Sequence, residues 1–162
     1  MNDFYTEQLI KKRSDMKDVL KKVLLIAITI VSAAIVLVIP IGIIIPIIMI
    51  VVDIFVFRSL DVEYENLYLN GDLDIDKIMH KEKRKRMFST NVSDMEIMAP
   101  ANSAELNSYK NARVYNYTSG NPDAKVYEMI IVSSGETKRL IFEPNEASVE
   151  GIWMMAPRKV IR

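Results

Sequence analysis

Hydrophobic residues fill one uninterrupted stretch in the first third of the chain, whereas the rest of the sequence mixes apolar and charged positions. Between residues 23 and 52 no side chain is charged, and the only polar ones are Thr29 and Ser32. A run of roughly 18 or more apolar residues is typical of a transmembrane helix, because about 20 residues cross a ~30 Å hydrocarbon core. The pattern therefore predicts a segment that inserts into a membrane.

The apolar stretch is too long for one straight helix, and it contains residues that break helices. It resumes after Asp53 and reaches Phe57, which would make a single helix about 52 Å long. Pro40, Gly42 and Pro46 lie near its middle, where a missing backbone donor and a flexible backbone favour a turn. We predict a transmembrane α-helical hairpin within residues 18–58, with helices near 18–39 and 43–57. The shortness of the second helix leaves open whether the hairpin spans the membrane or is re-entrant.

Charge on both flanks of the stretch predicts its orientation. Basic residues are concentrated before the first helix and again after Arg58, and Lys/Arg-rich flanks stay cytoplasmic. Two passes satisfy both flanks, so we expect a multi-pass protein of the bacterial cytoplasmic membrane with both termini cytoplasmic. A cleaved signal peptide is disfavoured because the apolar run is too long. A single pass with an external C-terminal domain stays open, since the sequons at Asn91 and Asn116 and the lack of cysteine are compatible with it.

Asp53 is the one ionisable residue within the apolar stretch. Acidic groups inside a membrane are costly and often functional. Asp53 lies five residues before Arg58, so an interfacial position is one interpretation. A role in partner contact or ion handling is the other.

The N-terminal residues 1–17 form a cytoplasmic segment in this interpretation. Phe4, Tyr5, Leu9 and Ile10 recur at roughly helical spacing among charged residues. The spacing suggests a short amphipathic helix on the membrane surface, with a solvated tail as the alternative.

Residues 59–162 alternate apolar and polar positions in short runs, which is typical of strands. Runs at 62–69 and 73–79 flank Asn70-Gly71, a strong signal for a two-residue hairpin. In that register one face of the hairpin is apolar, and the other is acidic. We expect the acidic face to be solvated or to meet something cationic, and it is a candidate partner face. It carries Glu63, Glu65, Asp72, Asp74 and Asp76.

A basic run follows, which we interpret as a turn that leads into a strand at 87–90. It is a candidate contact for anionic lipid headgroups, with a solvated loop as the alternative. Nucleic acid is not an expected partner, because no aromatic residue interleaves the run. The candidate headgroup contacts are Lys81, Lys83, Arg84, Lys85 and Arg86.

Further strands are predicted at 92–98, 113–117, 126–132 and 137–142, the last two as a hairpin that pairs Ser133 with Glu136. A helix beginning near Pro144 and ended by Pro157 follows, with Trp153 as a core residue. The soluble part is thus an α+β, mainly β domain. Its element order is that of a pleckstrin-homology-like (PH-like) barrel of about seven strands capped by a C-terminal helix.

The residue types present exclude several chemistries. The chain has no cysteine and one histidine, and it has neither a glycine-rich phosphate loop nor a zinc motif. We therefore expect no enzyme, no metal site and no cofactor.

Five segments carry a resemblance that covers nearly the whole chain: residues 2–9, 61–65, 69–78, 142–145 and 156–160. In these the chain resembles a family of small Firmicutes membrane proteins that contain a domain of unknown function, and its soluble part resembles bacterial PH-like domains. The resemblance implies a protein-interaction or assembly role at the cell membrane and supplies no activity.

These observations favour a membrane-anchored, non-catalytic binding or scaffolding module that presents a PH-like domain at the inner leaflet. Its expected partners are the lipid bilayer and a protein partner or a second copy of the chain. The alternative is an accessory subunit of a membrane complex, in transport or envelope assembly, that assembles through its hairpin around Asp53.

Overall fold

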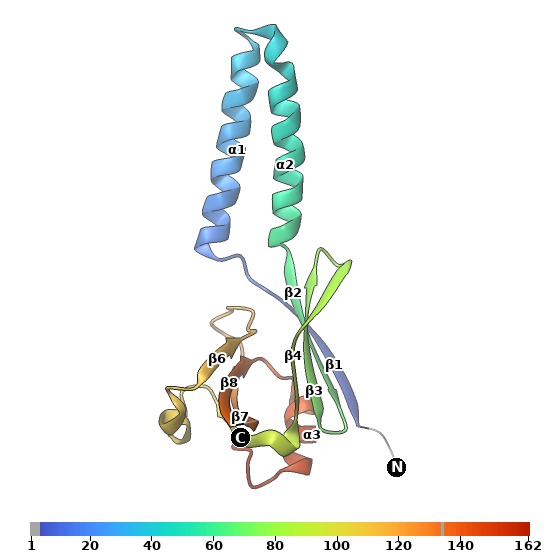
Figure 1. Cartoon of the computed structure of the whole chain (residues 1–162), viewed down its shortest axis with the longest axis vertical. Coiled ribbons are helices and arrows are strands. Elements are labelled where there is room, and N and C mark those ends of the chain that lie inside the picture. Colours follow the sequence, from blue (N-terminus) through green and yellow to red (C-terminus); the bar gives the residue numbers. More distant parts are fainter. Residues whose placement is uncertain (1–3, 134) are drawn as a thin grey trace.

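The computed structural model describes residues 4–133 and 135–162, and it places a pair of helices on a two-sheet domain (Figure 1). The helices are α1 (Met16–Val36) and α2 (Ile44–Leu60), joined through the 3-10 turn η1 (Pro40–Ile43). They lie side by side and point away from the domain. Among the described residues, α1 is the one helix long and apolar enough to cross a membrane by length and composition. The break near Pro40 is a turn between two helices, as predicted, whereas a hairpin in which both helices span a membrane stays a prediction.

The N-terminal segment is a strand, so the expectation of an amphipathic surface helix or a solvated tail is wrong there. Strand β1 (Tyr5–Lys11) pairs antiparallel with β2 (Val62–Leu69) along its whole length. Ile10 packs in the domain core, and exposure alternates along β1 with period 2. The few apolar residues fit helical and strand spacing equally, and pairing with β2 decides between them. Residues 1–3 lie outside the described residues.

The pairing of β1 with β2 makes the two helices a long connection between neighbouring strands. Lys11 lies opposite Glu63, and the Lys12 N–H donates to the Val62 carbonyl at 3.0 Å. The chain leaves the sheet at Lys12 and returns at Val62. One sheet is therefore assembled from both sides of the apolar stretch.

The first sheet has the order β1-β2-β3-β4, with all pairs antiparallel. Its remaining strands are β3 (Asp72–Met79) and β4 (Lys83–Asn91). The predicted hairpin at Asn70-Gly71 is confirmed, with φ of 47° and 102° at the two residues, as a two-residue turn requires. The basic run does not form a turn throughout: the turn is confined to residues 80–82, and the run from Lys83 onward belongs to β4.

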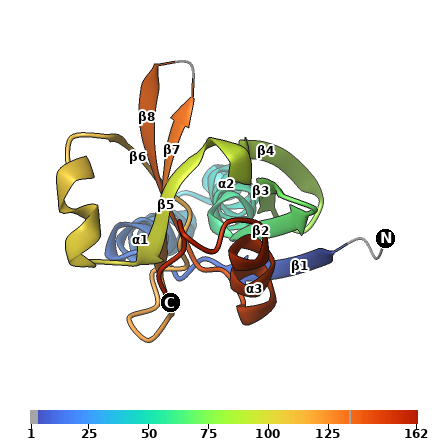
Figure 2. The same ribbon diagram turned by 90° about the horizontal axis from the view of Figure 1, so that it is seen from below.

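The second sheet has the order β5-β7-β8-β6, in which β6 runs parallel to β8. Its strands are β5 (Met95–Pro100), β6 (Arg113–Asn116), β7 (Tyr127–Ser133) and β8 (Glu136–Phe142). The predicted pairing of Ser133 with Glu136 is confirmed. The single closed barrel of seven strands is not: the described residues form eight strands in two separate sheets (Figure 2). The short turn η2 (Val92–Asp94) redirects the chain between β4 and β5, and no ladder joins the sheets there.

The core lies between the inner faces of the two sheets. Tyr68, Leu73 and Ile75 of the first sheet and Leu140 and Phe142 of the second are almost completely buried, as the alternation predicts. Helix α3 (Glu146–Met155) covers the end of this core that lies away from the helix pair (Figure 1). Its first turn is capped by the Asn145 side chain, which accepts the Ser148 N–H at 2.7 Å.

Trp153 is only partly buried, and Arg162 lies over its ring at 4.1 Å. It packs against the core cluster from outside, so the predicted core position is not confirmed. A further turn, η3 (Ala104–Tyr109), buries Leu106 beside the second sheet.

Gly151 allows α3 to approach the first sheet closely. A Cβ at this position would overlap the Phe4 ring and would lie 2.6 Å from the Tyr68 ring. These two rings meet edge to face, with centroids 5.9 Å apart. The contact joins the N-terminal strand, the first hairpin and the C-terminal helix.

Replacing Gly151 with Ala should therefore destabilise the folded chain by about 1–3 kcal/mol, because the added methyl group forces rings or helix apart. Trp153 is the single tryptophan, so its fluorescence reports thermal unfolding of the full chain in detergent. Gly42→Ala is the control, since a Cβ there meets no atom within 4 Å. An unchanged midpoint in Gly151→Ala would contradict the tight packing.

Candidate functional site

The acidic face and the basic run that the sequence singled out form one ion-pair network on the outer face of the first sheet. Arg84 Nη2 lies 2.7 Å from Glu65 Oε1. Arg86 contacts Asp74 at 3.0 Å through Nη2 and Asp76 at 3.2 Å through Nε. The acidic face was expected to meet something cationic, and Arg84 and Arg86 of the same chain supply these positive charges.

The register of β3 and β4 creates this network. Asp76 lies opposite Arg86, and Glu65 of β2 lies opposite Asp76. A bulge in the β3–β4 ladder between Ile75 and Asp76 shifts the pairing by one residue, so that Phe88 faces the core and the arginines face the carboxylates. Such a bulge leaves no clear mark in the sequence.

Several of these carboxylates are buried although they lie on an outer face. Glu63, Glu65 and Asp76 are each less than a tenth exposed. Burial raises the pKa of the Glu65 carboxyl, a hydrogen bond with Glu7 raises it further, and Arg84 opposes the rise. Asp72 is exposed, and its carboxylate accepts a hydrogen bond from Asn91 Nδ2 at 2.7 Å. Little of the predicted partner face is therefore free to meet another molecule.

The lysines of the basic run are placed differently from its arginines. Lys81, Lys83 and Lys85 are exposed, and within residues 4–133 and 135–162 none of them forms an ion pair. The turn that carries Lys81 reaches the end of α2, where the His80 N–H donates to the Asp61 carbonyl at 3.1 Å. The candidate headgroup contacts thus separate into paired arginines and free lysines.

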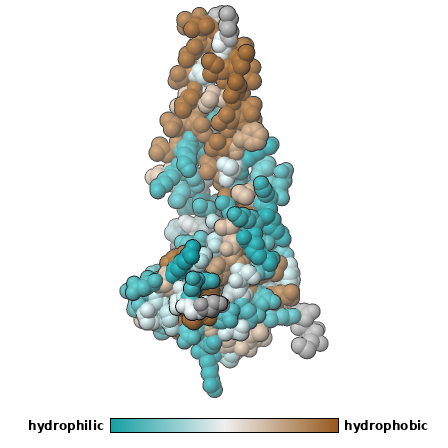
Figure 3. Space-filling model, in the orientation of Figure 1, coloured by the Kyte–Doolittle hydropathy of each residue, from teal (hydrophilic) through white to brown (hydrophobic). Residues whose placement is uncertain are grey.

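Basic residues from both ends of the apolar stretch meet at the base of the helix pair. We call this set the basic collar. It separates the apolar helices from the domain as a hydrophilic band (Figure 3). It consists of Lys11, Lys12, Arg13, Lys17, Lys21, Lys22, Arg58, Lys81 and Lys83.

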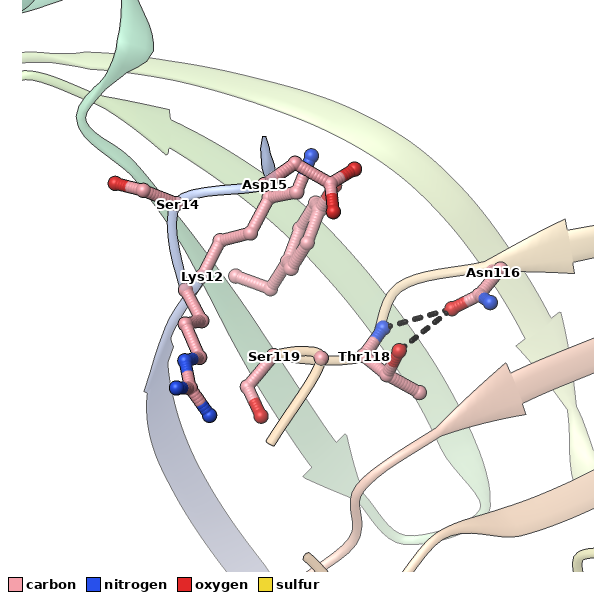
Figure 4. A pocket seen from close by; sticks show the side chains of 9 residues that line it. Lys12, Ser14, Asp15, Asn116, Thr118 and Ser119 are labelled. Carbon is pink, nitrogen blue, oxygen red and sulfur yellow. Dashed lines mark hydrogen bonds between the residues drawn. The ribbon is translucent and has the colours of Figure 1, made fainter. Parts of the chain in front are cut away.

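A polar cavity of about 420 Å³ lies under the start of α1, at the end of the core opposite α3. The linker between β1 and α1 forms one wall, and the loop after β6 forms the other (Figure 4). The two walls are tied together by the Arg13 N–H, which donates to the Ser119 carbonyl at 2.7 Å. The cavity is lined by Lys12, Arg13, Ser14, Asp15, Tyr64, Asn116, Thr118, Ser119 and Gly120.

Hydrogen bonds fix the loop side of this cavity. The Asn116 side-chain oxygen accepts the Thr118 N–H at 3.1 Å and the Thr118 hydroxyl at 2.8 Å (Figure 4). Glu143 accepts both the N–H and the hydroxyl of Ser119, at 2.7 and 2.8 Å. The cavity joins residues that are about a hundred positions apart, and we did not predict it from the sequence.

Asp53 faces α1 and does not reach toward Arg58. Its Oδ2 accepts a hydrogen bond from the Thr29 hydroxyl at 2.7 Å, and the Ser32 hydroxyl donates to the Thr29 carbonyl at 2.7 Å. The second carboxylate oxygen, Oδ1, is buried and has no hydrogen-bond partner among the described residues. The polar residues of the apolar stretch thus meet between the helices. In the described part of the chain, no group of acidic residues and histidine is arranged to hold a metal ion.

The Arg84–Glu65 pair should make stability depend on pH. Arg84→Gln should cost about 1 kcal/mol at neutral pH, since Arg84 is 56% exposed and its ion pair is partly screened. A carboxyl with a raised folded-state pKa contributes stability at low pH that is lost as the pH rises through that pKa. Removing Arg84 raises the pKa of Glu65 further, so the cost should grow as the pH rises above the ordinary pKa of a glutamate.

Urea unfolding of the full chain at several pH values measures this cost. Lys85→Gln is the matched control, because it removes the same charge from the same strand at an exposed residue without an ion pair in the described chain. Equal, pH-independent effects of the two substitutions would contradict the network.

Comparison with known proteins agrees with this architecture. Neither the curated proteins nor the solved structures include a significant match to the chain. One family model, described as "Bacterial PH-like domain (DUF6106)", matches residues 2–162, and so includes β1 as well as the two sheets and α3. The chain therefore belongs to this family of bacterial PH-like domains of unknown function.

Proposed function

We propose that the protein is a membrane-anchored, non-catalytic binding module whose helix pair inserts into the bacterial cytoplasmic membrane and holds the PH-like domain at the inner leaflet. The observation that carries this proposal is the apolar surface of the two helices. Only 6% of the apolar window of α1 is buried inside the molecule, and most large side chains of α2 are likewise exposed (Figure 3). Soluble monomers rarely expose contiguous apolar patches larger than a few hundred Å².

The pairing of β1 with β2 supports a pair of helices that enters and leaves the membrane on one side. The chain leaves the first sheet at Lys12 and returns to it at Val62, so both ends of the inserted segment lie beside the domain. A single pass would place β1 and β2 on opposite faces of the bilayer and break their ladder. The apolar part of α1, from Val23 to Val36, is about 21 Å long, so together with the turn at Pro40 it covers most of a ~30 Å hydrocarbon core.

The basic collar supports a cytoplasmic position of the domain. Lys and Arg residues beside membrane segments stay on the cytoplasmic side and are attracted to anionic lipids, at about 1 kcal/mol per residue near the surface. The collar lies where the apolar surface ends, so its side chains reach the headgroups when the helices are inserted.

A binding role fits the family and the anchored arrangement. A PH-like domain of unknown function fits a non-catalytic module. Anchoring raises the local concentration of the domain at the inner leaflet, so a protein partner or a second copy of the chain needs only modest intrinsic affinity. The outer edge of β1 and the free edge of β4 are the strand edges that such a partner would meet.

Single cysteines test this topology cleanly, because the chain has none of its own. Lys17→Cys and Asn121→Cys should resist a membrane-impermeant maleimide in intact bacteria and react in inverted membrane vesicles, since both lie on the cytoplasmic side. Labelling of Asn121→Cys in intact cells would instead place the domain outside and contradict the proposal. Gly42→Cys in the turn between the helices distinguishes a full crossing, in which it reacts from outside, from a re-entrant hairpin.

The second candidate function is an accessory subunit of a membrane complex that assembles through the helices. The observation that favours it is the buried Asp53 Oδ1, which no described residue satisfies. An unpaired polar atom is costly in an apolar surrounding, so a partner helix that repacks against α1 and α2 and brings a donor to this oxygen would be stabilised.

Asp53→Asn tests this candidate, because it keeps an acceptor for Thr29 but replaces the charge. Loss of a defined oligomer or complex in mild detergent, measured by light scattering, is the result expected of an accessory subunit. Thr29→Val is the control, since it removes the internal hydrogen bond at 2.7 Å and leaves the carboxylate in place. Assembly unchanged by Asp53→Asn would exclude this function.

A further inference from the structure

The cavity under the start of α1 has the composition of an anion site. Two cationic side chains, Lys12 and Arg13, contribute to its lining, and in the part of the chain that the structure describes neither forms an ion pair. By contrast, Arg84, Arg86 and Arg139 each contact a carboxylate within 3.2 Å. Positive charge is therefore left uncompensated in a concave, polar place.

Neutral donors surround these cations. The Asn116 side-chain oxygen accepts from Thr118, which leaves its Nδ2 group as a donor among the lining residues. Ser14 belongs to the opposite wall, with its hydroxyl pointing away from Asn116 and Thr118 in Figure 4. The Ser119 hydroxyl is already used by Glu143 and supports the loop. Amide, hydroxyl and cationic donors around one small space are the groups that bind phosphate oxygens.

The charge of the lining indicates which kind of phosphate fits. Lys12 and Arg13 contribute two positive charges and Asp15 contributes one negative charge, so the lining has a net charge of one positive. A phosphodiester carries one negative charge, whereas a phosphomonoester carries close to two near neutral pH. The Asp15 side chain makes no capping hydrogen bond to α1 and lines the cavity, where its negative charge disfavours a dianion.

The position of the cavity indicates where the phosphate comes from. The cavity lies directly below the first turn of α1, within the basic collar, and its linker wall continues into that helix. On the proposed function, this level of the molecule coincides with the headgroups of the inner leaflet. A lipid headgroup then needs no displacement from its own layer to reach Lys12 and Arg13.

We propose that this cavity binds the phosphodiester headgroup of an anionic glycerophospholipid of the inner leaflet, a proposal that rests on the proposed membrane anchoring. The bound phosphate bridges the β1–α1 linker and the loop after β6, which the Arg13 N–H already joins. The lipid thereby fixes the angle between the helix pair and the domain. This site is distinct from the free lysines of the β3–β4 turn, which contact headgroups without enclosing one.

Variants of the full chain in detergent test the site, with retained phosphatidylglycerol counted by native mass spectrometry. Asn116→Asp keeps the acceptor for Thr118 but places a negative charge at the cavity. It should reduce retention about tenfold, whereas Asn111→Asp, the same change at an exposed residue outside the cavity, should leave retention unchanged. The double change Lys12→Gln/Arg13→Gln should reduce retention similarly, and Lys17→Gln/Lys21→Gln should not.

Two further measurements identify the source of the phosphate and separate this proposal from the anchoring on which it rests. Inorganic phosphate at about 10 mM should not displace the lipid, and displacement would assign the cavity to a soluble anion and overturn the proposal. Alkaline extraction of membranes reports anchoring independently. If the chain stays in the membrane but Asn116→Asp and Asn111→Asp retain lipid equally, the cavity proposal fails alone; if the chain is extracted, the anchoring fails.

Discussion

The antiparallel ladder between β1 and β2 is the interaction on which the rest of the structure depends. It joins residues 5–11 to residues 63–69 across the whole apolar stretch, so the domain closes only when both ends of the helix pair are together. Phe4 then reaches Tyr68 and α3, and the linker after β1 reaches the loop at Ser119. The β1–β2 ladder thus fixes the edge of the first sheet, the surface against which α3 packs, and the position of α1 and α2.

The basic residues of the described chain fall into two groups, those paired with carboxylates and those without such a partner. On the outer face of the first sheet, Arg84 and Arg86 neutralise carboxylates that the strand register has buried, and this pairing stabilises the domain. At the base of the helices, Lys11 contacts Asp61 at 3.6 Å, whereas the other lysines of the basic collar and Arg13 have no ion pair within the described chain. Charges of the first kind are satisfied inside the molecule, whereas those of the second kind are free to meet an anionic surface.

The two ends of the two-sheet core differ in the same way. Helix α3 covers the distal end with apolar side chains, including Val149 and Ile152, which belong to the main core. The end nearer the helices is not covered by an apolar element, and a polar cavity remains there. On the proposed function, this open end faces the membrane in which the helices are anchored, which is where a lipid ligand would bind.

The sequence by itself determined the features that depend on neighbouring residues. The unbroken apolar stretch and its prolines predicted two helices, and Asn70-Gly71 and the alternation around residues 133–136 predicted two hairpins with their registers. Period 2 alone predicted the core-facing residues of those hairpins but not the burial of Glu63, Glu65 and Asp76 on the opposite face of the first one. Tertiary structure decided what depends on contacts between distant segments, because a short pattern does not specify its partner: the strand at Tyr5–Lys11, the bulge that turns Arg86 toward Asp76, the separation into two sheets, and the cavity between Lys12 and Asn116.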